Sequence, residues 1–146
     1  MLLTILIIAP IRNNGRRDNL NSNKIILFVY GTLQTGQRNH GLLAGSDLLG
    51  VFDLNGYALY ELGSFPGIVR KPDGKVRGEA YLVSSETLSV VNEFEGEGYI
   101  YDLTDVCLSN DKGHQLYAKA YIFNRSVVGR KVIPYEQLPW DEKKVY

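Results

Sequence analysis

The chain has 146 residues, of which 45% are apolar and 22% are charged, a composition typical of an ordinary globular domain. Sixteen basic residues balance sixteen acidic ones, so no net field attracts nucleic acid or anionic lipid. We therefore expect one folded domain whose partner is neither a nucleic acid nor a membrane.

Cysteine and histidine are scarce in the chain. Cys107 is the single cysteine, so the sequence excludes an intrachain disulfide and a cysteine-based metal site. We expect Cys107 to be an inert thiol in or near the core, and the chain to act in a reducing, cytoplasmic setting. His40 and His114 lie far apart in the sequence, so no metal site is expected.

Residues 1–23 differ in character from the rest of the chain. Met1 to Ile11 is apolar but shorter than the roughly 20 residues that span a bilayer. Arg12 to Asn23 is rich in asparagine and basic residues and has no periodicity. Two interpretations of this N-terminal extension stay open: a disordered or loosely attached segment, or an extra strand or partner-binding arm. The folded domain is predicted to cover residues 24–146.

The segment Ile25 to Tyr30 is nearly all apolar, which predicts a central strand buried on both faces. The strand runs into Gly31, so the backbone N–H groups that follow are unpaired and uncovered. Such a concave set of amides suits an anion or an oxyanion. Gly31 and Gly36 have the spacing of a nucleotide phosphate loop. That loop needs Lys and then Ser or Thr where Gln37 and Arg38 stand, so we reject this interpretation.

Turn signals divide the next part of the chain. Asn39 is predicted to cap a short helix that ends near Ala44. His40, in the first turn of that helix, either contacts a pocket or hydrogen-bonds the preceding loop. Asn55-Gly56, between alternating apolar residues, predicts a tight hairpin. Lys71 to Gly74 is predicted to be another turn.

The second half of the chain predicts alternating strands around one helix. A strand over Val76–Val83 comes first, followed by a helix that is capped by Ser84 or Ser85, runs to Glu95 and is closed by Gly96 and Gly98. Two strands over Tyr99–Leu108 and Leu116–Phe123 are then joined by a turn at Asn110–Gly113. The chain ends in a surface tail that Trp140 anchors.

One carboxylate of this helix has an unusual position. Val91 and Phe94 belong to the apolar stripe, and Glu95 lies four residues after Val91, at the edge of the buried face. Glu93 and Glu97 point towards solvent. Because burial disfavours a charged carboxylate, Glu95 is a candidate general base with a pKa near neutrality. The alternative is a partly exposed carboxylate at a fraying helix end.

Two separated segments carry a resemblance to a known family. They are Tyr30-Gly31-Thr32-Leu33 with Gly36-Gln37-Arg38-Asn39-His40, and Asn92-Glu93-Phe94-Glu95-Gly96 with Gly98-Tyr99. Three shorter pieces lie between them in the family's order: Gly56-Tyr57-x-Leu59-Tyr60, Phe65-Pro66-Gly67 and Gly78-Glu79-Ala80-Tyr81. The ordered set resembles the γ-glutamylcyclotransferase family over roughly residues 25–123, and it is most similar to the γ-glutamylamine cyclotransferases.

The resemblance implies an α+β fold, a single domain with a mixed β-barrel-like sheet and short helices packed outside it. It also implies a small-molecule γ-glutamyl substrate that is cyclised to 5-oxoproline with release of the free amine, without a cofactor. Carried over by motif, the acid/base residue is Glu95, and the substrate-binding residues are Tyr30, Gly31, Thr32, Leu33, Pro66 and Gly67.

Two positions depart from the family pattern. Asn92 stands where Asp is usual, which removes a second carboxylate near the site. Tyr101 stands where Arg is common, which changes either the pinning of the loop or the leaving group that is accepted. Two other functions stay open: a non-catalytic small-ligand-binding or interaction module with this fold, and an enzyme that removes a γ-glutamyl group from a larger biosynthetic intermediate. The leaving group and the oligomeric state also stay open.

Overall fold

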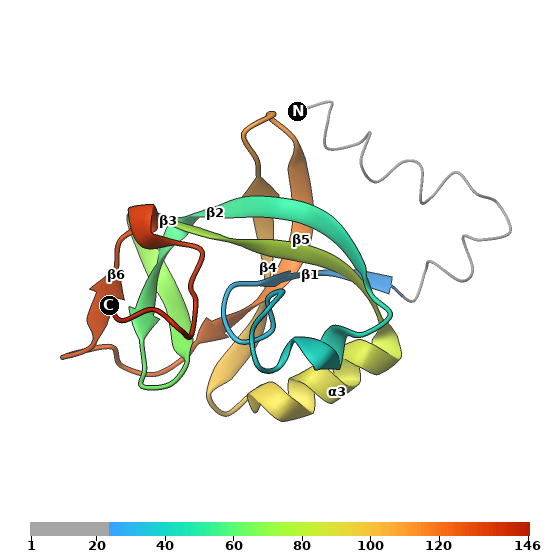
Figure 1. Ribbon diagram of the computed structural model, residues 1–146, viewed down its shortest axis with the longest axis horizontal. Helices are drawn as coiled ribbons and strands as arrows, with labels where there is room; N and C mark the ends of the chain where they lie inside the picture. Colours follow the sequence, from blue (N-terminus) through green and yellow to red (C-terminus); the bar gives the residue numbers. More distant parts are fainter. Residues whose placement is uncertain (1–23) are drawn as a thin grey trace, which may run out of the picture.

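The computed structural model describes residues 24–146 (Figure 1). The interpretations of residues 1–23 lie outside the described residues. The elements are β1 (Lys24–Val29), η1 (His40–Leu43), β2 (Asp47–Glu61), β3 (Pro66–Ser84), α3 (Ser85–Glu95), β4 (Tyr101–Ser109), β5 (Gln115–Phe123), β6 (Lys131–Ile133) and η2 (Tyr135–Gln137), where η denotes a 3₁₀ helix.

The strands form one mixed sheet that returns on itself. Their order is β3-β1-β5-β4-β2-β6, and β2 also pairs with β3, so the first five strands make a ring. β1 runs parallel to β5, whereas every other pairing is antiparallel. The helix α3 lies outside this ring, below the sheet in Figure 1. The predicted α+β fold, with a closed mixed sheet and helices outside it, is confirmed.

The long hairpin of β2 and β3 corrects two predictions. Asn55-Gly56 is not a hairpin turn, because β2 continues through it to Glu61 and pairs there with Pro66. Gly56 uses its positive φ of 86° at a register shift within the strand. Opposite Gly56, residues Lys71 to Gly74 have no paired partner in β2 and form an irregular bulge inside β3, not a turn between two elements.

β1 is buried on both faces, as its apolar run predicts. Phe28 points to the inside of the ring, where it belongs to a cluster with Leu59, Leu108 and other residues. Leu27 and Val29 point to the other face and pack with a second cluster that includes Val91 of α3. Because the strand separates two cores, its C-terminal end is held from both sides.

The C-terminal segment adds a short strand and an anchor. β6 pairs with the end of β2, an extension that the sequence did not predict. Trp140 is 4% exposed and packs in the inner cluster, which confirms it as an anchor. Cys107 corrects a prediction: it is exposed, because its position in β4 faces away from the core between buried Val106 and Leu108.

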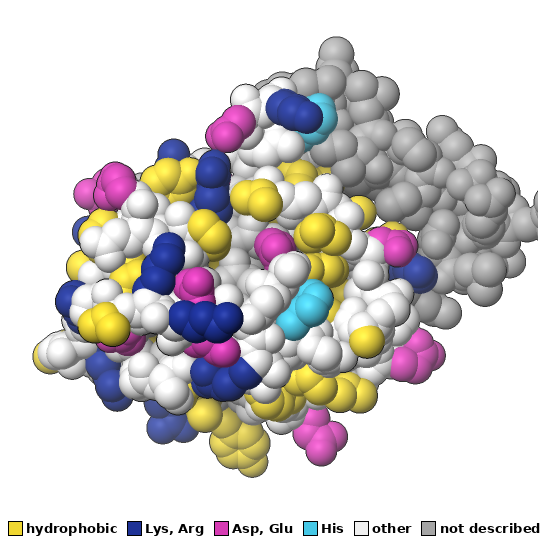
Figure 2. All heavy atoms as spheres, in the orientation of Figure 1, with side chains coloured by type: hydrophobic (Ala, Val, Ile, Leu, Met, Phe, Trp, Pro, Cys, Tyr) yellow, Lys and Arg dark blue, Asp and Glu magenta, His cyan; other side chains and the backbone are white. Residues whose placement is uncertain are grey.

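The surface in Figure 2 intersperses Lys and Arg with Asp and Glu side chains. Within residues 24–146, no helix has the length and apolar character that crossing a membrane requires.

The close approach of β3 to β1 allows only glycine at position 78. A Cβ atom there would overlap the carbonyl oxygen of Val29 and lie 3.0 Å from the ring of Phe28. We expect Gly78→Ala to destabilise the protein by about 1–3 kcal/mol, because the two strands have to separate. Gly41→Ala is the control, since a Cβ atom at Gly41 meets nothing within 4 Å. Equal melting temperatures for the two variants would contradict this packing.

Candidate active site

The local structure of α3 sets the position of Glu95. The hydroxyl oxygen of Ser84 caps the helix by accepting from the Thr87 N–H at 3.1 Å. Gly96, with a φ of 68°, ends it in a left-handed cap. Val91 is fully buried one turn before Glu95, so the last turn of the helix presents Glu95 to the interior.

The loop after β1 is held from behind by hydrogen bonds. The Nδ1–H of His40 donates to the Leu33 carbonyl at 2.9 Å, and the Asn39 N–H donates to the Thr32 carbonyl at 3.0 Å. The Thr35 N–H donates to a Glu79 carboxylate oxygen at 2.8 Å. Of the two roles open for His40, the structural one is therefore present. Within the described chain, the backbone N–H groups at positions 31–33 donate no hydrogen bond.

Gly31 is required by a close approach rather than by its φ. A Cβ atom at this position would lie 2.7 Å from Cγ of Pro66, so the proline ring can lie against the loop only because residue 31 has no side chain. The Tyr101 hydroxyl donates to the Pro66 carbonyl at 2.9 Å and holds the proline from the opposite side. The loop and Pro66 thus form one packed wall.

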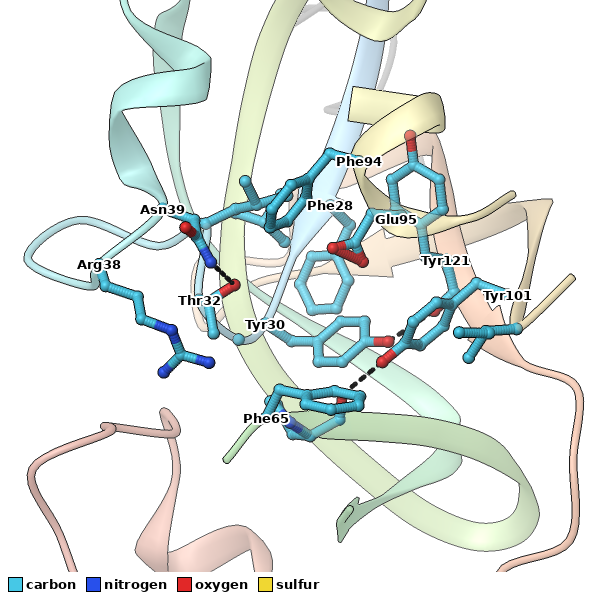
Figure 3. A pocket seen from close by; sticks show the side chains of 15 residues that line it. Phe28, Tyr30, Thr32, Arg38, Asn39, Phe65, Phe94, Glu95, Tyr101 and Tyr121 are labelled. Carbon is cyan, nitrogen blue, oxygen red and sulfur yellow. Dashed lines mark hydrogen bonds between the residues drawn. The ribbon is translucent and has the colours of Figure 1, made fainter. Parts of the chain in front are cut away.

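The loop, Pro66 and the end of α3 surround a single cavity of about 210 Å³ (Figure 3). Its lining residues are Phe28, Val29, Tyr30, Gly31, Thr32, Leu33, Arg38, Asn39, Phe65, Pro66, Phe94, Glu95, Ile100, Tyr101 and Tyr121. The cavity brings together segments of the chain that are more than sixty residues apart, and its wall is mostly apolar and aromatic.

Glu95 is the carboxylate of this cavity. Burial raises its pKa from 4.5 to about 7. Among residues 24–146 it has neither an ion pair nor a hydrogen-bond donor for its side chain. Arg38 also lines the cavity, but its guanidinium binds Glu142 at 3.2 Å and the Ser64 carbonyl at 2.9 Å. Glu95 therefore takes up and gives up a proton near neutral pH.

Three tyrosines surround this carboxylate. Burial and the nearby Glu95 raise the pKa of Tyr30, Tyr101 and Tyr121, so all three phenols keep their protons. The Tyr30 hydroxyl donates to the Tyr121 carbonyl at 2.6 Å. The Tyr121 hydroxyl donates to the side-chain oxygen of Asn92 at 2.6 Å, so Asn92 serves as an acceptor at the edge of the site.

The cavity includes most of the residues that the sequence singled out. Tyr30, Gly31, Thr32, Leu33, Pro66 and Glu95 all line it. Gly67 is not part of the lining, and a Cβ atom at this position would point at the side chains of Leu62 and Phe123. Glu93 and Glu97 are exposed, as the helical periodicity predicts.

Sequence reasoning did not place the aromatic wall. Phe94 was interpreted as part of the core stripe, yet it is 47% exposed and lies over the cavity. Phe65, Ile100 and Tyr121 also line it and were not singled out. The nearest signal for Phe94 and Phe65 is their position beside the predicted site residues Glu95 and Pro66. Ile100 lies beside Tyr101, which departs from the family pattern, and Tyr121 lies on a predicted strand.

The described part of the chain contains no group of three His, Cys, Asp or Glu side chains that could hold a metal ion. The wall of the cavity carries the titratable carboxylate of Glu95, the backbone of the loop and three neutral phenols.

Comparison with known proteins identifies the family of this chain. Residues 27–142 match the family described as "Gamma-glutamyl cyclotransferase, AIG2-like". The chain belongs to the γ-glutamylcyclotransferase family. A family protein of Escherichia coli, YtfP, is 34% identical over 107 residues, which cover 73% of this chain and 89% of YtfP.

Further relatives and a solved structure are also similar to this chain. A Vibrio cholerae relative is 46% identical over 71 residues, which are 48% of this chain and 61% of that protein. The gamma-L-glutamyl-butirosin B gamma-glutamyl cyclotransferase of Niallia circulans is 35% identical over 105 residues, covering 68% and 67%. The structure of a mouse AIG2-like protein, 22% identical, superposes with a TM-score of 0.67 over 84% of this chain and 89% of that one, which shows the shared fold.

The raised pKa of Glu95 predicts how its removal changes stability with pH. Well below pH 4.5 the carboxyl is protonated in both the folded and the unfolded chain, so its ionisation does not change the free energy of unfolding. Between 4.5 and about 7 the unfolded chain loses this proton first, so the wild type becomes less stable as pH rises. We expect Glu95→Gln to be more stable than wild type above pH 7, by up to about 3 kcal/mol, and equal to it below pH 4.5.

The measurement is denaturant unfolding of the two proteins across this pH range. Glu93→Gln is the control, because Glu93 is exposed on the same helix. A stability difference between wild type and Glu95→Gln that stays constant with pH would show that Glu95 is not desolvated.

Proposed function

We propose that this protein cyclises the γ-glutamyl group of a γ-glutamyl amine or peptide to 5-oxoproline and releases the free amine. The observation that carries the proposal is the shared cavity of Glu95 and the loop amides at positions 31–33. A proton acceptor and a set of oxyanion donors are the two components that such an intramolecular acyl transfer needs.

Glu95 supplies the proton transfers. In its ionised form it takes a proton from the α-ammonium group of the substrate, and the freed amine attacks the γ-carbonyl carbon of the same glutamyl group. The new C–N bond closes the five-membered ring. Glu95 gives this proton to the leaving nitrogen and takes the second proton from the ring nitrogen, so the bond to the leaving nitrogen breaks and a neutral lactam is left. The released amine or solvent then carries that last proton away from Glu95. A pKa of about 7 suits both the basic and the acidic step.

The loop supplies electrostatic stabilisation. During ring closure the γ-carbonyl oxygen becomes an oxyanion, and the N–H groups of the loop are the donors that could receive it. The hydrogen bonds behind the loop, to His40 and Glu79, hold these donors in place before the reaction. One such donor contributes about 2.7–4 kcal/mol in other enzymes. Because nucleophile and electrophile belong to one molecule, positioning alone lowers much of the barrier, and the proposal needs no cofactor.

The second candidate is an enzyme of the same chemistry with a larger substrate. The similarity to the Niallia circulans protein, whose name specifies a γ-glutamyl-butirosin, favours this candidate. Phe94 and Ile100 at the cavity are 47% and 37% exposed, so apolar surface is available beside the leaving group. A 5-oxoproline release assay over γ-glutamyl-lysine, γ-glutamyl-alanine, glutathione and a γ-glutamylated aminoglycoside separates the leaving groups. Release from none of them would favour a non-catalytic binding module.

Glu95→Gln should reduce kcat/KM by at least about 10²-fold, because the amide cannot accept the proton. The control is Glu93→Gln, which changes an exposed carboxylate two residues away and is expected to keep wild-type turnover. The assay is 5-oxoproline release with the best donor, with circular dichroism to confirm folding. Wild-type turnover by Glu95→Gln would show that Glu95 is not the base.

The pH profile should report the same carboxylate. Because the reaction begins with ionised Glu95, we expect kcat/KM to fall about tenfold per unit below a limb near pH 7. An ordinary exposed glutamate would place that limb near pH 4.3. A profile that stays flat from about pH 5 to pH 8 would contradict a desolvated base.

A further inference from the structure

We propose that the phenol oxygens of Tyr30 and Tyr101 form, with Glu95, the binding site for the α-ammonium group of the substrate. This inference rests on the proposed function and adds to it a substrate contact for Tyr101 and a specific role for the phenol oxygen of Tyr30.

The polarity of two hydrogen bonds carries the argument. The Tyr30 hydroxyl is bonded to the backbone carbonyl of Tyr121 at 2.6 Å, and the Tyr101 hydroxyl to that of Pro66 at 2.9 Å. A carbonyl oxygen can only accept, so each phenol must be the donor and its one hydrogen is committed. The Ile68 backbone also hydrogen-bonds the Tyr30 oxygen, so one lone pair of Tyr30 and the lone pairs of Tyr101 remain. These lone pairs can only accept hydrogen bonds.

The two oxygens and the carboxylate face the same space. Tyr30, Tyr101 and Glu95 all line the cavity, and the charge of Glu95 raises the pKa of both phenols, which shows their proximity. In Figure 3 the hydroxyls of Tyr30 and Tyr101 meet below the Glu95 carboxylate, whereas the hydroxyl of Tyr121 points upwards to the helix. Tyr121 therefore stays outside the proposed subsite.

The number of acceptors fits an ammonium group. An ammonium carries three N–H donors and no acceptor. The Glu95 carboxylate accepts one donor and neutralises the charge, and two phenol oxygens remain for the other two. Both tyrosines are at most 6% exposed, so little water competes for these positions. A glutamyl group acylated at its α-nitrogen has one donor and no charge, and it would leave these acceptors unpaired.

The test compares the binding of two stable ligands by calorimetry at about pH 8. L-Methionine sulfone has the α-amino acid head of a γ-glutamyl group and a sulfone in place of the scissile amide. The second ligand is its counterpart with hydrogen in place of the α-amino group. We expect wild type to prefer the amino ligand, and Tyr30→Phe and Tyr101→Phe each to reduce this preference about tenfold or more.

The matched control is Tyr135→Phe. The hydroxyl of Tyr135 is also a committed donor, to the Asp53 carboxylate at 3.0 Å, but Tyr135 lies outside the cavity lining. The ligand preference should be unchanged in this variant. If Tyr30→Phe and Tyr101→Phe act only by loosening the wall, they weaken both ligands equally and keep the preference, and that result would overturn the proposal.

Two further outcomes also decide the question. Equal binding of the two ligands by wild type, including no binding of either, would overturn the subsite without any variant. The measurement needs no turnover, so it is independent of the proposed function. A protein that prefers the amino ligand through its phenols but releases no 5-oxoproline would keep the ammonium subsite and lose the cyclotransferase activity.

Discussion

Desolvation of one carboxylate is the constraint on which the site depends. Glu95 is held in a cavity of phenyl and phenol groups, without a cation or a donor among the described residues, and burial alone raises its pKa to about 7. Burying a carboxylate without a partner lowers the stability of the folded protein. Other contacts of α3 offset this loss of stability, because the helix is capped at both ends and buries Val91 against the sheet.

The opposite wall of the cavity depends on a second constraint, the absence of a side chain at Gly31. Pro66 can lie against the loop only because of it, and the phenol of Tyr101 then fixes the proline. His40 and Glu79 hold the loop from its outer side. The loop that lines the cavity is thus part of a backbone held by several contacts, and such preorganisation is what the proposed oxyanion stabilisation requires.

The sequence was sufficient for elements that local patterns decide, and insufficient where tertiary contacts decide. The apolar run of β1, the serine cap and the Gly96 end of α3 are local signals. The strand and the helix end are confirmed, and of the two serines predicted as the cap, Ser84 is the one that caps. Asn55-Gly56 has the local signature of a hairpin, but its glycine serves a register shift because β2 continues to pair with β3. The face of Cys107 depends on strand register, which the alternation of its segment did not determine.

The candidate site shows the same division. Helical periodicity and the resemblance together placed Glu95, whereas the partners of Tyr101 and Asn92 come from strands far away in the chain and could not be predicted.

The residues at positions 92 and 101 also affect the pKa of Glu95. A carboxylate at position 92 would repel the charge of Glu95 and raise its pKa further, whereas an arginine at position 101 would attract it and lower the pKa. This chain has a neutral amide and a neutral phenol instead. Both charged influences are therefore absent together, and the proton affinity of Glu95 is set by burial.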